Sequence, residues 1–86
     1  MTDVKEFVTE YIQREYTVPA EVDIMTLNYV EAGYIDSLGM LQFIATIEDE
    51  FNVVFSDEDM KSSDIKVVGT LIDMIKNKME VGYEEY

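Results

Sequence analysis

The stretch Gly33-Tyr34-Ile35-Asp36-Ser37-Leu38-Gly39 places a serine where a loop ends and a strong helical pattern begins. Ser and Asp are the residue types that accept hydrogen bonds from the unpaired N–H groups of a helix's first turn. This helix end also carries the positive end of the helix dipole, which makes it a favourable place for a phosphate. We therefore interpret Ser37 first as a helix cap, at a position that also suits a bound anion.

The residues after this stretch predict a helix over about 37–51. Its core face consists of apolar residues that recur at helical spacing, namely Met40, Phe43, Ile44, Ile47 and Phe51. A second stripe lies beside this face and turns partly outward: Leu38, Leu41, Ala45 and Glu48. Leucines in such a stripe indicate either a surface for a partner or a wider buried face.

Three further helices complete the expected fold. Asp3 caps a helix that runs to about Tyr16, a short helix after Ser56 runs to about Lys61, and a last helix covers about 66–79. The long connection 17–36 carries scattered apolar residues, so we expect it to be ordered. The sum is an all-α fold, a small four-helix bundle with three longer helices and one short one. We expect a single domain over 1–86, with a core of about 4–79 and a flexible tail, 80–86.

The composition argues against most enzyme classes. The chain has no Cys and no His, and its formal net charge is -13. It therefore has no thiol-based metal or redox site and no histidine base, and we expect neither catalytic residues nor a dedicated metal site. Weak binding of divalent cations by clustered carboxylates stays open. From Glu15 to Met60 there is no Lys or Arg, and such a charge distribution repels nucleic acid and favours partners with basic patches.

Nothing in the sequence indicates a membrane segment or a secretion signal. No apolar run approaches the length that spans a bilayer, and the N-terminus has no basic segment before an apolar run. We expect no membrane insertion, a cytoplasmic location and a monomer.

At Asp36-Ser37-Leu38 the chain resembles the acyl carrier proteins, which are small acidic four-helix bundles that carry 4′-phosphopantetheine on a serine. The resemblance covers about Val4 to Lys78. The triplet follows a long loop and precedes an apolar helix that ends Ile47-Glu48-Asp49-Glu50-Phe51. A short acidic helix and a final amphipathic helix then follow in the order usual for that family.

This resemblance implies that a separate phosphopantetheinyl transferase joins the arm of coenzyme A to Ser37 through a phosphodiester, with Asp36 and Leu38 beside the attachment point. Acyl groups would be held as thioesters on the arm and delivered to acyl-loading and acyl-transfer enzymes of fatty-acid, lipid or secondary-metabolite synthesis. The chain itself would be no enzyme. The resemblance also implies that basic patches of these partners dock on Leu38, Leu41, Ala45, Glu48 and Asp49.

Two departures from the pattern of fatty-acid-synthesis carriers favour a specialised carrier. The loop glycine is Gly33, one position earlier than in those carriers, and Gly39 stands where an acid usually follows Leu38. This form looks more like stand-alone carriers, including D-alanyl carriers, so an aminoacyl carrier is one alternative. The other is an unmodified acidic protein-interaction domain of the same fold. Several residues are candidates either for a cavity that takes an acyl chain or simply for the core: Phe43, Ile44, Ile47, Phe55, Met60, Ile65 and Leu71.

Overall fold

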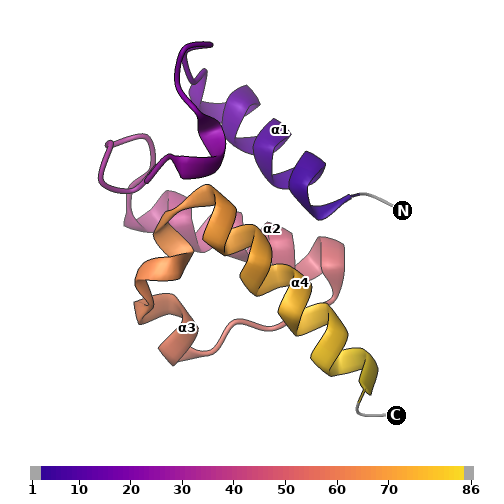
Figure 1. Ribbon diagram of the computed structural model, residues 1–86. Helices are drawn as coiled ribbons and strands as arrows, with labels where there is room; N and C mark the ends of the chain where they lie inside the picture. Colours follow the sequence, from indigo (N-terminus) through magenta and orange to yellow (C-terminus); the bar gives the residue numbers. More distant parts are fainter. Residues whose placement is uncertain (1–2, 85–86) are drawn as a thin grey trace.

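The computed structural model describes the backbone of residues 3–84 and the side chains of residues 3–79. Its α-helices are α1 (Val4–Tyr16), α2 (Ser37–Phe51), α3 (Asp57–Lys61) and α4 (Val68–Glu84). Two short 3-10 helices, η1 (Ile24–Thr26) and η2 (Ser63–Lys66), lie before α2 and before α4 (Figure 1). The predicted all-α fold, with three longer helices and one short one, is confirmed.

Side-chain caps fix where the first three α-helices begin. Asp3 accepts a hydrogen bond from the backbone N–H of Glu6, and Asp36 accepts one from Gly39. Ser56 and Asp59 form a reciprocal capping box at the start of α3, in which each side chain accepts from the other's backbone N–H. Each cap satisfies donors that have no partner inside the helix. These local signals explain why all three helices start where the sequence predicts.

The core lies between α1, α2 and α4. Val8 and Ile12 of α1, Phe43 and Ile47 of α2, and Leu71 and Ile75 of α4 are fully buried there. Aromatic contacts join α1 to α2, because the Tyr11 ring stacks on Phe43 with centroids 4.5 Å apart. The predicted core face of α2 is therefore buried along its middle, while Met40 and Phe51 at its two ends are half-buried.

The long connection between α1 and α2 is held against the start of α4. Tyr29 is fully buried, and its hydroxyl donates a hydrogen bond to the Ile65 carbonyl at 2.5 Å. The backbone N–H of Val68 donates to the Leu27 carbonyl at 3.1 Å. A Cβ at Gly69 would lie 2.8 Å from the Met25 carbonyl oxygen, so α4 needs a glycine where η1 crosses it. These contacts pin the connection across the bundle, as its apolar residues predict.

The last helix differs from the prediction at both ends. It begins at Val68 instead of about Lys66, because Ser62 caps the separate turn η2 and its hydroxyl accepts from the Asp64 N–H. It continues through Glu84, so residues 80–84 of the tail belong to α4, while 85–86 lie outside the described residues. None of the described helices is long and apolar enough to cross a membrane.

Candidate functional site

At the start of α2, one residue caps the helix and the next carries the exposed hydroxyl. Asp36 is the N-cap, and its Oδ1 accepts a hydrogen bond of 2.7 Å from the Gly39 N–H. Ser37 is the first helical residue, and it is exposed. Its hydroxyl has no hydrogen-bond partner among the residues that the structure describes. The interpretation of Ser37 as the cap is therefore wrong, because the carboxylate one residue earlier already occupies that position.

Gly39 makes room for this cap. A Cβ built at Gly39 would lie 3.0 Å from Cγ1 of Ile35 and 3.1 Å from Oδ1 of Asp36. A side chain there would therefore crowd the carboxylate that caps the helix. The sequence pattern showed Gly39 only as a departure from related carriers, whereas the structure gives it a steric reason.

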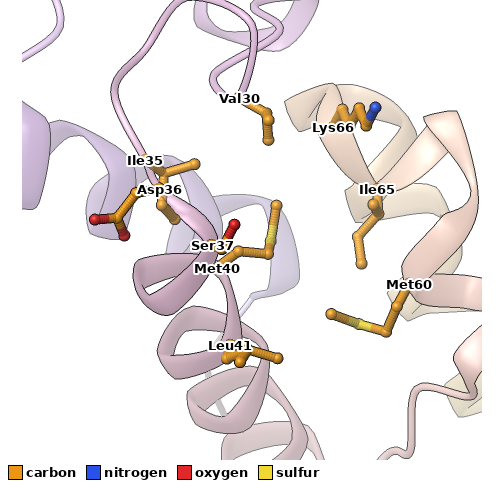
Figure 2. Close-up of a pocket in the computed structure, with 9 residues that line it drawn as sticks. All are labelled: Val30, Ile35, Asp36, Ser37, Met40, Leu41, Met60, Ile65 and Lys66. Carbon is orange, nitrogen blue, oxygen red and sulfur yellow. The ribbon is translucent and has the colours of Figure 1, made fainter.

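A cavity of about 500 Å³ opens beside Ser37, between the start of α2 and the α3–η2 segment (Figure 2). Asp36 and Ser37 stand at its α2 edge and Lys66 on the opposite side, and the rest of the lining is apolar: Val30, Ile35, Met40, Leu41, Met60 and Ile65. An exposed nucleophilic hydroxyl thus adjoins an apolar space.

The cavity differs from the one that the apolar pattern suggested. Of the candidates, Met60 and Ile65 line it, whereas Phe43, Ile44, Ile47 and Leu71 are buried in the core. Phe55 is also buried and does not line the cavity. The core face of α2 points towards α1 and α4, so the space facing α3 begins at the first turn of α2 instead. Sequence reasoning missed Val30, Ile35 and Lys66 as lining residues, because no periodic pattern connects the loop before α2 with η2.

The second stripe of α2 lies on the surface. Leu38 is 65% exposed and Leu41 is 59% exposed, and Ala45 and Asp49 are exposed further along the helix. The alternative of a wider buried face is therefore excluded for the two leucines. Large apolar side chains exposed next to each other are typical of an interaction surface.

Glu48 differs from the other members of the stripe. Its side chain is half-buried, and its Oε2 accepts a hydrogen bond of 2.8 Å from the Phe55 N–H. The carboxylate thus ties the end of α2 to the extended link that leads to α3. Any docking role of Glu48 is combined with this structural one, which the sequence did not reveal.

An ion pair holds α3 against α4 near the other wall of the cavity. The Lys78 ammonium contacts Oδ2 of Asp59 at 2.5 Å and lies 5.0 Å from the centre of the Phe55 ring. The hydrogen bond from Lys78, and then the one from the Ser56 N–H, hold the pKa of Asp59 below its ordinary value. No group of three or more potential acidic metal ligands occurs among the described residues.

Comparison with known proteins shows the family to which the chain belongs. The family model described as a phosphopantetheine attachment site matches residues 6–75. The chain is also 28% identical over 78 residues to the acyl carrier protein of Buchnera aphidicola subsp. Schizaphis graminum (strain Sg). The aligned residues make up 91% of this chain and 96% of that protein. No solved structure gives a significant match. Since the family model spans most of the chain, the protein belongs to the acyl carrier protein family, whose prosthetic group is a covalently bound 4′-phosphopantetheine.

Proposed function

We propose that this chain carries acyl groups on a 4′-phosphopantetheine arm joined to Ser37. The observation that carries the proposal is the state of the Ser37 hydroxyl: exposed, not used as a cap, and at the edge of an apolar cavity. A phosphodiester at this position would lie at the positive end of the α2 dipole, where an anion is favoured. The residues present therefore fit the group.

The residues around Ser37 position the hydroxyl and do not activate it. The Asp36 carboxylate accepts the Gly39 N–H, and this hydrogen bond fixes the first turn of α2. The chain contains no His or Cys that could act as a base for the serine. Since the neighbouring Asp36 carboxylate serves as the helix cap, we infer that the phosphopantetheinyl transferase takes the proton of Ser37. The bound arm supplies a terminal thiol that holds the cargo as a thioester, and we infer no enzymatic activity for the carrier itself.

The lining of the cavity supports an acyl group over an aminoacyl group as cargo. Six of its side chains are apolar, and the opposite charges of Asp36 and Lys66 stand at its edges, so the interior offers no polar partner to an ammonium group. Such an environment suits a hydrocarbon chain, which gains free energy when it leaves water. We therefore propose cargo from fatty-acid, lipid or secondary-metabolite synthesis, and keep the D-alanyl type of carrier as the alternative that this lining disfavours.

Partner enzymes would dock on the exposed stripe of α2. Leu38 and Leu41 supply apolar contact area, and Ala45, Glu48 and Asp49 extend the stripe towards the acidic end of the helix. The net charge of -13 would steer basic patches of the transferase and of acyl-loading and acyl-transfer enzymes towards this surface. We expect such association to be transient and to weaken as salt is added.

Intact-protein mass spectrometry tests the proposal. The purified chain is incubated with coenzyme A and a broad-specificity phosphopantetheinyl transferase, beside Ser37→Ala and the matched control Ser63→Ala, which removes another exposed serine. We expect one added phosphopantetheine in the wild type and in Ser63→Ala, and none in Ser37→Ala. A folded wild type that gains no mass would instead support an unmodified interaction domain. A gain in Ser37→Ala would place the arm elsewhere.

A further inference from the structure

Two methionines face each other across the cavity beside Ser37. Met40 comes from α2, one turn after Ser37, and Met60 comes from the end of α3. Figure 2 shows both side chains directed into the space between α2 and the α3–η2 segment. A chain that leaves Ser37 and enters this space therefore meets Met40 first and Met60 opposite it.

The methionines differ from the β-branched part of the lining in how easily they move. Val30, Ile35 and Ile65 are β-branched, so their side chains are stiff at the first torsion. Ile65 is also fixed through its backbone, because its carbonyl accepts the Tyr29 hydroxyl. Methionine has three rotatable bonds and a polarisable thioether, which lets it adapt to partners of different shape. Met40 and Met60 are half-buried and pack against the core without being enclosed by it.

The backbone that carries Met60 is held in place, so the side chain has to make the adjustment. The Ser56–Asp59 capping box closes the start of α3, and the Lys78–Asp59 ion pair fastens this short helix to α4. On α2, the Asp36 cap fixes the turn that precedes Met40. A longer occupant of the cavity therefore finds a fixed backbone on both sides and the two methionine side chains, which can adjust, between them.

We propose that Met40 and Met60 form an adjustable pair that decides how long a straight, apolar acyl chain the cavity accepts. This inference rests on the proposed function, since the chain must be attached through Ser37. Short chains fit between the two thioethers as they stand, and longer ones enter as the Met60 side chain turns aside. The pair makes this protein tolerant of several chain lengths up to a limit that Met60 sets.

Loading the protein with straight acyl groups of increasing length tests the pair directly. A transferase attaches each acyl-phosphopantetheine from the corresponding acyl coenzyme A, and the melting temperature of each product is compared with that of the acyl-free form. We expect the melting temperature to rise with chain length and then to level off. The NMR signals of the Met40 and Met60 methyl groups should shift with chain length, while those of Met25 and Met74, which do not line the cavity, stay in place.

Substitutions at Met60 should move the length limit. Met60→Phe fills the cavity with a stiff ring, so the rise should level off at shorter chains than in the wild type. Met74→Phe is the matched control, because Met74 is half-buried on α4 outside the cavity, and it should leave the limit unchanged. Each variant is compared with its own acyl-free form, so a general loss of stability does not affect the comparison.

The possible failures are distinguishable. A wild-type chain that takes up no phosphopantetheine overturns the proposed function itself. A chain that loads every acyl group, yet shows the same methyl signals and the same melting temperature for all lengths, overturns the methionine pair alone. The pair is also overturned if Met60→Phe and Met74→Phe show the same length limit.

Discussion

Replacing Tyr29 with Phe removes a single oxygen from the buried centre of the long connection. The Tyr29 hydroxyl donates to the Ile65 carbonyl at 2.5 Å, and the ring packs edge-on against Phe43 with centroids 5.9 Å apart. Phenylalanine keeps the ring and its aromatic contact. The substitution thus removes the hydrogen bond that holds the connection to η2, together with a weak contact of 3.9 Å between the hydroxyl and the Met40 sulfur.

The expected loss of stability follows from the carbonyl left behind. A buried acceptor that loses its partner costs about 1–3 kcal/mol, and we expect about 2 kcal/mol for Tyr29→Phe at neutral pH. For a domain of this size each kcal/mol lowers the melting temperature by about 4–8 °C, so the melting temperature should fall by about 8–16 °C.

The same loss should disappear in alkali. Burial, and then the nearby Tyr16, raise the pKa of Tyr29 above the ordinary tyrosine value of about 10. In the folded state the phenol therefore stays protonated, whereas in the unfolded state it ionises above about pH 10. Its contribution is complete below that pH and decreases by up to about 1.4 kcal/mol per pH unit above it. The wild type should thus lose its advantage of about 2 kcal/mol by roughly pH 11.5.

Urea unfolding followed by circular dichroism measures both effects, at pH 7 and then in steps from pH 9 to 11.5. Tyr34→Phe is the matched control, because Tyr34 is half-buried and its hydroxyl makes no hydrogen bond within the described part of the chain. Tyr34→Phe should change the free energy of unfolding by less than about 0.5 kcal/mol. Equal losses for the two variants, or a Tyr29→Phe difference that stays constant through pH 11.5, would refute the reasoning.

Three further predictions concern charged side chains. Lys78→Met should lower stability by about 1 kcal/mol at pH 7, since the pair is partly exposed. The lowered pKa of Asp59 means that its contribution is present above the ordinary carboxyl pKa of about 4 and is lost as the pH falls below it. Acid unfolding curves of wild type and Lys78→Met should therefore converge near pH 2, and a constant gap would contradict this account. On the α2 stripe, Asp49→Lys should slow modification by the transferase with little effect on folding, because Asp49 is exposed. Glu48→Lys should slow it too, but should also cost about 1–3 kcal/mol, because the Phe55 N–H loses its carboxylate acceptor. Modification rates and urea unfolding check both, and a wild-type rate for Asp49→Lys would remove that residue from the docking surface.

The sequence predicted those helix bounds that depend on residues close together in the chain. The bounds of α2 follow from the Asp-Ser start and the apolar spacing, and the starts of α1 and α3 follow from Asp3 and Ser56. The choice between Asp36 and Ser37 as cap was not predictable, because either side chain can cap. Backbone conformation and the space above Gly39 decide it.

Features that depend on contacts between residues far apart in the sequence could not be predicted. The start of α4 at Val68 depends on Leu27 as well as on the turn η2 that Ser62 caps, because the Leu27 carbonyl accepts the Val68 N–H across the bundle. The lining of the cavity joins Val30 to Lys66 and Met60, which only the folded chain brings together. The exposure of Leu38 and Leu41 was likewise one of two alternatives until the position of α2 in the bundle was known.

Because the helix cap is Asp36 and the proposed attachment point is Ser37, a copy of this protein that lacks the serine would still keep the cap. The exposed Ser37 side chain makes no hydrogen bond within the described part of the chain, so we expect its replacement by Ala to leave the fold intact. A chain with Ser37→Ala would keep the cap, the cavity and the exposed leucines, and would therefore still be bound by the proposed partners while bearing nothing. Such a chain is a competitive decoy: at high expression it would occupy the partner enzymes and slow a pathway that still contains the intact carrier.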